Sequence, residues 1–245
     1  MNILVIGQSH IAAIRAAAKT RRERNPERPR TRVIHTLEPH YAPEIDEQGE
    51  EPRFSAPLEA TILDQIARHG PLVVSAMGGN FHNALTLLQH PRPFDFSLSG
   101  EPSPPFVRGA EPVPESLVRA ALEHGLARDF TRLRLLRAVT GPFVHLESPP
   151  PVRDDGFIRD SAEAWFKDKA GGEIAIAPAA LRYRIWRLNT GIFRKAVEAL
   201  GCRFQPVPRE TQDADGFLLP QFAGDATHGN EAYGEAVIRS LESGA

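Results

Sequence analysis

The 245-residue sequence is poor in cysteine, in net charge and in long hydrophobic runs, and each shortage excludes something. Cys202 is the only cysteine, so no internal disulfide can form, and its apolar neighbours favour a buried side chain over a nucleophile. The formal net charge of −2 gives no electrostatic reason to expect a nucleic-acid partner.

Apolar runs are too short for a targeting or membrane segment. The apolar run before Gly7 is shorter than the core of a signal peptide, and no other stretch approaches the length of a transmembrane helix. We therefore expect no membrane partner and, if Met1 is the true start, a cytoplasmic protein. The composition leaves the oligomeric state open.

Hydrophobic patterning predicts one α/β domain over residues 1–245. Five short apolar runs, typical of buried strands, alternate with stretches that have helical spacing. Such alternation predicts a doubly wound parallel sheet with helices on both faces. The predicted strands are Ile3–Ile6, Arg32–Leu37, Leu72–Met77, Phe143–Leu146 and Cys202–Val207.

Two long proline-rich segments, at about residues 90–114 and 149–178, interrupt this alternation as insertions. Between them, the spacing of leucines predicts one long helix over Ser116–Val139. In the second insertion, Asp160-Ser161-Ala162-Glu163 resembles a capping box that opens a short helix carrying Trp165 and Phe166.

Polar segments follow three of the predicted strands. They are Gly7-Gln8-Ser9-His10, Gly78-Gly79-Asn80 and Asp225-Ala226-Thr227-His228. Because the carboxyl ends of parallel strands meet at one edge of the sheet, we expect these segments to lie close together. Alone, Ser9 is more typical of a helix cap and His228 of a surface histidine, so the convergence is the stronger signal.

The residue types match the needs of acyl transfer. A serine becomes a good nucleophile when a histidine takes its proton, and that histidine needs a carboxylate to fix its tautomer. Asp225 and His228 are three residues apart, so one turn can bring their side chains together. The side-chain amide of Asn80 and the backbone N–H of Ser9 can stabilise the oxyanion.

These residues resemble the motifs of the SGNH hydrolases of the GDSL-like superfamily. In that family a Gly-x-Ser motif follows strand one, a Gly-x-Asn motif follows strand three, and an Asp-x-x-His pair lies near the C-terminus. The resemblance spans nearly the whole chain and implies a three-layer α/β/α fold with strand order 2-1-3-4-5. It implies Ser9, Asp225 and His228 as a catalytic triad and Asn80 as an oxyanion donor, with no metal and no cofactor.

The chain departs from the family at Gln8 and Phe81, where aspartates are often found. The family's glycine between strands two and three donates a second backbone N–H to the oxyanion, and Gly49 is placed in that role. Candidates for lining the pocket are Gly79, His82, Trp165 and Phe166, the last two as an apolar wall.

The resulting expectation is a serine esterase or carbohydrate acetylesterase that acts on a small-molecule or carbohydrate ester. Transfer of the acyl group to a sugar would use the same residues, and a non-catalytic binding protein with this fold remains open. A metallophosphoesterase is disfavoured because strand one ends in Gln8-Ser9-His10 rather than an Asp-x-His pair. A nucleotide- or flavin-binding module is disfavoured because Gly-x-Gly-x-x-Gly does not follow strand one.

Overall fold

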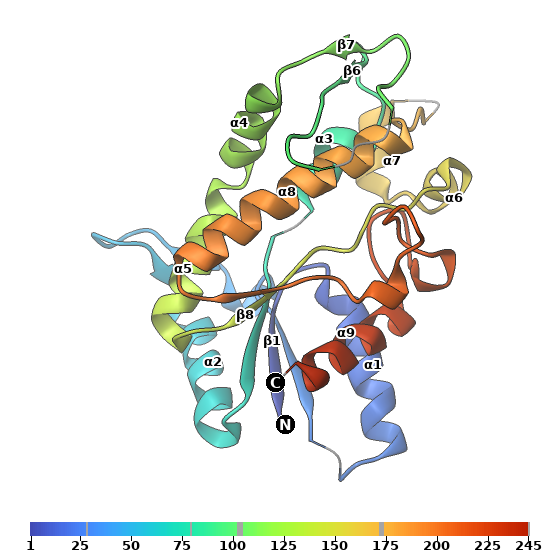
Figure 1. Ribbon diagram of the computed structural model, residues 1–245. Coiled ribbons are helices and arrows are strands. Elements are labelled where there is room, and N and C mark those ends of the chain that lie inside the picture. The colour runs from blue at the N-terminus through green and yellow to red at the C-terminus, as the bar shows by residue number, and fades with distance from the viewer. Residues whose placement is uncertain (28, 79, 102–104, 172–173, 245) are drawn as a thin grey trace.

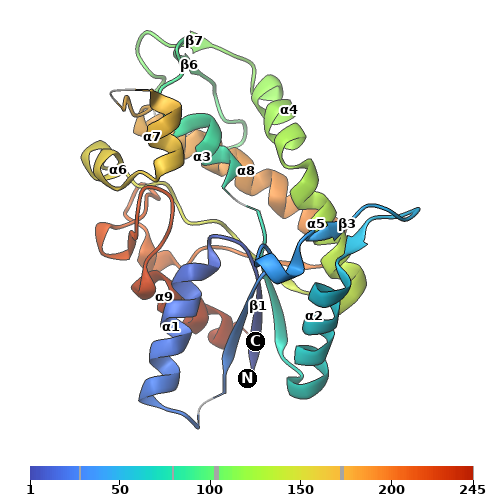
Figure 2. The ribbon, with the colours of Figure 1, turned by 180° about the vertical axis from the view of Figure 1, so that it is seen from behind.

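The computed structural model describes residues 1–27, 29–78, 80–101, 105–171 and 174–244. Its centre is a five-stranded parallel sheet with the order β2-β1-β5-β8-β9 (Figures 1 and 2). Counted along the chain, these five strands have the order 2-1-3-4-5, so the predicted doubly wound topology is confirmed. The strands are β1 (Ile3–Gly7), β2 (Thr31–His35), β5 (Leu72–Ala76), β8 (Val144–Leu146) and β9 (Arg203–Gln205).

Strand β1 forms because every side chain on it is apolar and both of its faces are covered. Leu4 and Ile6 pack into one hydrophobic core, whereas Ile3 and Val5 pack into the other. The strand ends at Gly7, where a Cβ atom would lie 2.4 Å from the carbonyl oxygen of Ala76. A glycine is therefore required for β1 and β5 to pair up to the edge of the sheet.

Two helical layers cover the sheet, so the fold is the predicted three-layer α/β/α arrangement. On one face, α1 (Ile11–Arg24) lies beside α9 (Glu231–Ser243), as both ribbon views show. A Cβ atom at Gly234 of α9 would lie 2.1 Å from the carbonyl oxygen of Ala13, so this glycine allows close helix packing. The other face is covered by α2 (Ala56–His69), α5 (Ala127–Thr140) and α8 (Ala179–Ala199).

The single helix predicted over Ser116–Val139 is two helices, α4 (Glu115–Gly125) and α5, which meet at Leu126. At the end of α4, a Cβ atom on Gly125 would lie 2.0 Å from the ring of Phe81 on α3 (Phe81–Thr86). The leucine spacing continues through the break because both helices face the same core, which explains why the pattern suggested one helix.

The first insertion contains the short strands β6 (Phe94–Asp95) and β7 (Glu111–Pro112). Arg184 of α8 fixes it by donating to both carboxylate oxygens of Asp95 at 2.9 and 3.0 Å. The side chains of this ion pair are 2% and 0% exposed. Removing either partner would leave an unpaired buried charge, which costs about 3–5 kcal/mol.

The second insertion folds differently from its predicted capping box. Its helices are α6 (Asp155–Ser161) and α7 (Ala164–Ala170), and Ser161 ends α6 instead of opening a helix. The side chain of Asp154 caps α6 by accepting from the backbone N–H groups of Gly156 and Phe157. Glu163 occupies the N-cap position of α7 but makes no side-chain capping bond.

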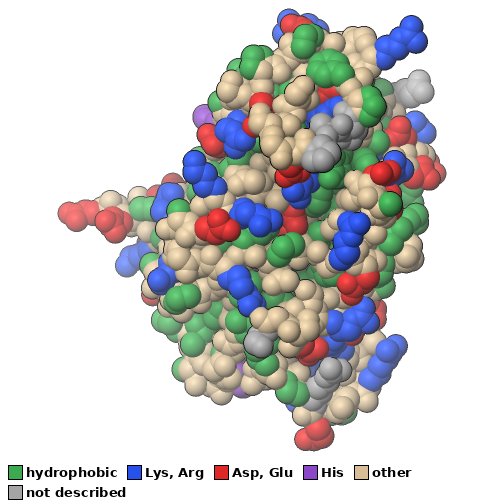
Figure 3. Space-filling model, in the orientation of Figure 1, with side chains coloured by type: hydrophobic (Ala, Val, Ile, Leu, Met, Phe, Trp, Pro, Cys, Tyr) green, Lys and Arg blue, Asp and Glu red, His purple; other side chains and the backbone are tan. Residues whose placement is uncertain are grey.

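A hairpin of β3 (Ile45–Asp46) and β4 (Arg53–Phe54) projects from the body of the molecule, as both ribbon views show. Figure 3 shows acidic side chains gathered at its tip, where Glu47, Glu50 and Glu51 are exposed. Elsewhere on this face, acidic and basic side chains are interspersed (Figure 3). The remaining elements are the 3₁₀ helices η1 (Pro39–Tyr41), η2 (Arg209–Thr211) and η3 (Pro220–Phe222).

Among the described residues, no helix combines the length and the apolar character needed to span a membrane.

Candidate active site

Ser9 lies on the turn between β1 and α1, at the carboxyl edge of the sheet. Its side chain is exposed, and its carbonyl oxygen accepts from the backbone N–H of Ala12 in the first turn of α1. Ser9 is not the cap residue of α1, because that position belongs to His10. A hydroxyl that is exposed and has no capping role is free to meet a substrate.

Gln8 joins the Ser9 turn to the turn that follows β5. Its side-chain carbonyl oxygen accepts from the backbone N–H of Gly78 at 3.2 Å. Gly78 has a φ of 71°, and a Cβ atom there would lie 2.8 Å from both Asp129 and Phe193, so the turn requires glycine. The residue that departs from the family motif therefore links two of the three predicted segments.

Asn80 follows this turn, at the N-cap position of α3. Its side chain makes no capping bond, and its carbonyl oxygen accepts from the side-chain amide of Asn83 at 2.7 Å. With its oxygen bound in this way, the amide N–H₂ group of Asn80 is the end that faces away from Asn83. An amide N–H₂ group that is not used in this contact can donate to another acceptor.

Asp225 and His228 occupy a tight loop before α9. The Oδ1 atom of Asp225 accepts from the backbone N–H groups of Thr227 and His228, each at 2.8 Å. Asn230 closes the loop by capping α9 and by donating to the carbonyl oxygens of Gln221 and Ala223. The aspartate is therefore held by its own loop before it meets the histidine ring.

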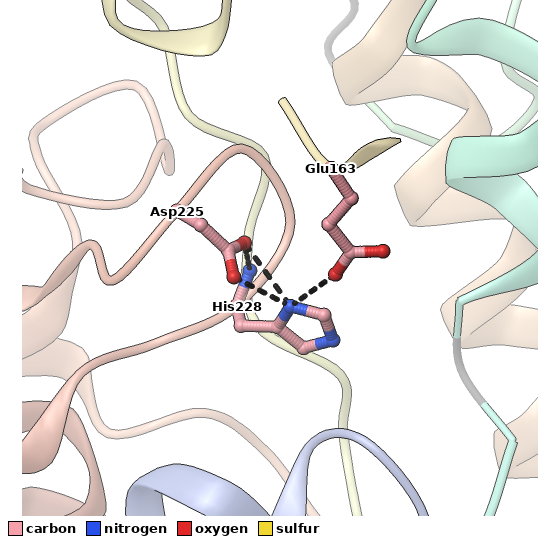
Figure 4. A group of neighbouring side chains, drawn as sticks. All are labelled: Glu163, Asp225 and His228. Carbon is pink, nitrogen blue, oxygen red and sulfur yellow. Dashed lines mark hydrogen bonds and ion pairs between the residues drawn. The ribbon is translucent and has the colours of Figure 1, made fainter. Parts of the chain in front are cut away.

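The histidine ring meets that fixed carboxylate directly. His228 Nδ1 lies 3.0 Å from each carboxylate oxygen of Asp225, and Figure 4 shows the two side chains facing one another. The hydroxyl oxygen of Thr227 is also 3.0 Å from Nδ1. Acceptor oxygens around Nδ1 favour the tautomer that carries its proton there, which leaves a lone pair on Nε2.

The electrostatics of the pair suit a general base. Burial alone would raise the pKa of Asp225, but hydrogen bonds from His228 and from the Thr227 backbone outweigh it and lower that pKa. Burial alone would lower the pKa of His228, but its hydrogen bond to Asp225 and the nearby negative charges outweigh it and raise that pKa. The loop therefore favours an ionised aspartate and stabilises the imidazolium form of the histidine.

The free nitrogen of His228 points to the side of the ring opposite Asp225 (Figure 4). Nε2 is buried and has no hydrogen-bond partner among the residues that the structure describes. The ring of His10, next to Ser9 in the chain, lies beside it with ring centroids 5.1 Å apart. The described contacts include the bonds between His228 and Asp225 but no hydrogen bond between Ser9 and His228.

The structure does not bring Gly49 to this site, so its predicted oxyanion role is corrected. Gly49 lies in the exposed turn of the β3–β4 hairpin, which projects from the body of the molecule (Figures 1 and 2). Gly49 is the only glycine between residues 38 and 57, but that segment contains the projecting hairpin. Gly49 therefore occupies the predicted segment of the chain, but the fold places it away from the site.

The four predicted pocket residues have different positions. Trp165 is 52% exposed on α7, two residues after Glu163. Phe166 is 3% exposed and packs in the hydrophobic core with α1 and α9, and His82 is 2% exposed within α3. Both belong to the interior of the fold rather than to an open pocket. Gly79 lies outside the described residues.

One residue at the site was not predicted as functional. Glu163, at the start of α7, has its Oε1 atom 3.3 Å from His228 Nδ1. No spacing signal links residues 163 and 228, because they come from separate segments that only the fold brings together. Within the described chain, Glu163, Asp225 and His228 are the group of potential metal ligands whose atoms lie within 4.8 Å of one another. A cation there would have to displace the Nδ1 proton that Asp225 accepts.

Beneath the site, a second histidine is enclosed in the sheet. His145 of β8 is 3% exposed, and its Nδ1 atom lies 3.1 Å from the hydroxyl oxygen of Ser75 on β5. Its ring stacks on Phe193 of α8, with centroids 5.2 Å apart and an interplanar angle of 10°. Burial lowers the pKa of His145 to about 3, so the ring is neutral at physiological pH.

Comparison with known sequences finds no family model and no curated protein that matches this chain. Comparison with solved structures does find similar folds, and the class that they represent includes lipases and an acetyltransferase domain.

Three of these structures illustrate the similarity. The periplasmic domain of a lipopolysaccharide acetyltransferase from Salmonella ser. Paratyphi A is 14% identical, with a TM-score of 0.49, over 99% of this chain and 82% of that one. A GDSL-like lipase from Bacteroides thetaiotaomicron is 12% identical, with a TM-score of 0.46, over 99% of this chain and 86% of that one. An extracellular lipase from Streptomyces rimosus is 11% identical, with a TM-score of 0.48, over 100% of both chains. Similarity this low says nothing about the chemistry of this chain, which depends on its own side chains.

Proposed function

We propose that the protein is a serine hydrolase of the SGNH type that cleaves carboxylic esters through a covalent acyl-enzyme. One observation carries the proposal. His228 has its Nδ1 atom held by Asp225 and its Nε2 atom unbonded among the described residues, at the sheet edge that also carries Ser9 and Asn80. Nucleophilic catalysis requires a base oriented in this way within reach of an exposed serine, and the two share this edge of the sheet.

The proposed reaction begins when Ser9 Oγ attacks the ester carbonyl carbon and His228 Nε2 takes the hydroxyl proton. The carbonyl oxygen becomes an oxyanion, which the Asn80 amide and the Ser9 backbone N–H stabilise. Collapse of the tetrahedral intermediate breaks the bond to the alkoxide, which takes the proton from His228. Water, activated by His228 in turn, attacks the acyl-enzyme and releases the carboxylic acid.

The same acyl-enzyme can pass its acyl group to a sugar hydroxyl, which would make the protein an acyltransferase. Product analysis separates the two fates. Acyl-enzyme formed from a short-chain aryl ester should release free acid in buffer, and an added sugar acceptor would yield an acylated sugar only if transfer occurs. The substrate proposed for either fate is a small-molecule or carbohydrate ester.

A fluorophosphonate probe, which reacts covalently with activated serines, tests the proposal directly. We expect the wild-type protein to be labelled on Ser9, as peptide mass spectrometry would show, and Ser9→Ala to remain unlabelled. Hydrolysis of a short-chain aryl ester should persist in EDTA, because no step uses a metal. An unlabelled wild type, or Ser9→Ala labelled equally well, would refute the proposed nucleophile.

Asn80→Ala tests the oxyanion role separately. Removing one preorganised oxyanion donor lowers kcat by about 10²- to 10³-fold in hydrolases of this kind. Labelling of Ser9 by the probe should continue at a reduced rate, because the nucleophile and base remain. A kcat equal to that of the wild type would assign Asn80 a purely structural role at the start of α3.

A further inference from the structure

Two carboxylates from distant segments face the same nitrogen of His228. Asp225 comes from the loop of the histidine itself, whereas Glu163 comes from the start of α7 in the second insertion. The Oε1 atom of Glu163 is 3.3 Å from Nδ1, and the Asp225 oxygens are 3.0 Å from it. Figure 4 shows the two carboxylates approaching the ring from different sides of Nδ1.

Contacts at both ends of α7 hold Glu163 in this position. The first turn of α7 is anchored by Phe166, which is 3% exposed and belongs to one of the two hydrophobic cores. Lys169 ties the other end of α7 to α3 by donating to the carbonyl oxygen of Ala84 at 3.0 Å. Glu163 uses its side chain neither to cap α7 nor, among the described residues, to bind a lysine or arginine.

The two carboxylates are bound very differently. Asp225 accepts backbone N–H groups of its own loop, so it keeps its position whatever the state of His228. Glu163 is 45% exposed, and within the described residues its side chain interacts with His228. Its contribution therefore depends on the charge of the ring and should grow when His228 becomes an imidazolium.

We propose that Glu163 is a positioning residue of the site, whose carboxylate shares Nδ1 of His228 with Asp225 and stabilises the imidazolium formed when Nε2 takes the proton of Ser9. This inference rests on the proposed function. No bond forms or breaks at Glu163, because the Nδ1 proton stays on His228 throughout. The insertion that carries α7 thus completes the base as well as forming an edge of the site.

The titratable groups that face His228 come from three elements. They are Asp225 on its own loop, Glu163 at the start of α7 and His10 on the turn after β1. Among them, the two acids favour the protonated ring, and the charge of Glu163 contributes to the raised pKa of His228. Removing that charge should therefore lower the pH at which His228 loses its proton.

Glu163→Gln tests this inference, because glutamine keeps the shape of the side chain and removes its charge. We expect the acid limb of the kcat/KM profile to move to lower pH, and the plateau value of kcat to fall by up to about fivefold, the size expected for a half-exposed ion pair. A histidine titration followed by NMR should show the same downward shift at His228, with no need for turnover.

Asp168→Asn is the matched control. Asp168 lies on the same helix, is exposed, and does not contact His228 in the described structure. Replacing it with asparagine removes the same unit of negative charge as Glu163→Gln. Its pH profile and its His228 titration should coincide with those of the wild type. Thermal unfolding and probe labelling of both variants would show that the fold and the nucleophile are intact.

The outcomes separate this inference from the proposed function. If the wild type hydrolyses esters but Glu163→Gln and Asp168→Asn have the same acid limb, the role of Glu163 is refuted and the hydrolase is not. If the wild type neither reacts with the probe nor turns over ester, the proposed function fails, whatever the NMR titration shows. If EDTA reproduces the Glu163→Gln defect in the wild type and Zn²⁺ restores activity, the three side chains bind a metal and the positioning role is overturned.

Discussion

Two histidines, the buried His145 inside the sheet and the partly buried His228 at its carboxyl edge, have opposite surroundings. His145 stacks on Phe193, and its one hydrogen-bond partner among the described residues is the neutral hydroxyl of Ser75. His228 instead faces the carboxylates of Asp225 and Glu163. Burial lowers the pKa of His145 to about 3, but the carboxylates raise the pKa of His228 in spite of burial. One ring is therefore held neutral, and the other is prepared to accept a proton.

This difference shows how the surroundings set the charge of the same residue type in two regions of the molecule. A neutral ring packed between aromatic side chains fills space and satisfies a strand hydroxyl. A ring bound through Nδ1 to an anion presents a basic Nε2 atom. Four changes should break or sharpen the comparison, in order of decreasing effect.

His228→Ala should produce the largest effect, on activity. Loss of the base should lower kcat for a short-chain aryl ester by about 10⁴-fold or more, as removal of a triad residue does elsewhere. Unfolding by denaturant should change far less, because the Asp225 turn keeps its backbone hydrogen bonds. Activity within tenfold of the wild type would assign the base to another residue.

His145→Ala should have the opposite outcome, with a large effect on stability. Removing a buried ring leaves a cavity beside Phe193 and deprives the Ser75 hydroxyl of its partner, which should cost about 2–5 kcal/mol of unfolding free energy. The kcat of the folded fraction should remain close to that of the wild type. His124→Ala, at an exposed position of α4, is the control and should change stability by less than about 0.5 kcal/mol.

The free energy of unfolding of the wild type should fall as the pH drops below 6.5, the ordinary pKa of histidine. The folded state keeps His145 neutral down to a pKa of about 3, whereas the unfolded chain binds a proton near pH 6.5. Between these values the unfolded state holds the extra proton, so His145 contributes a loss of up to about 1.4 kcal/mol per pH unit. Urea titrations at several pH values would give the free energy of unfolding as a function of pH. Its slope against pH should be shallower for His145→Phe than for the wild type. Equal slopes would contradict a neutral His145 in the folded state.

The smallest effect concerns the pH dependence of activity. His228 must be unprotonated at Nε2 to act as a base, and its pKa is raised above the ordinary value of 6.5. The kcat/KM profile should therefore rise with pH along a limb whose midpoint lies above 6.5. A midpoint at or below that value would indicate that the carboxylates do not control the ring.

Much of the fold follows from local patterns. Each of the five predicted strands is present with its ends within two residues or so, because buried parallel strands are continuous apolar runs bounded by turns. The helix predicted over Ser116–Val139 was wrong in its continuity, because α4 ends at Gly125. That glycine lies against the ring of Phe81, a residue distant in sequence. The capping box at Asp160 was wrong because Ser161 ends α6 there.

At the site, predictions based on motifs and predictions based on position fared differently. The motif residues lie in short segments whose geometry depends on neighbouring residues; they are Gly7, Gln8, Ser9, Asp225 and His228. The Asp225–His228 contact forms within one turn. Gly49 and Phe166 were assigned by position alone, and the structure places one on a projecting hairpin and the other in the core. The catalytic roles of Ser9 and Asn80 stay predictions until the probe and the variants test them.

The sequence by itself determined the alternation of strands and helices, the three polar segments at the strand ends and the Asp225–His228 pair, because each depends on residues close together in the chain. Only the tertiary structure decided which histidine is neutral and which faces two acids, since a pKa depends on burial and on charges brought from elsewhere. It also decided that Glu163 joins the site. A contact between residues 163 and 228 exists only because α7 packs against the core through Phe166 and against α3 through Lys169.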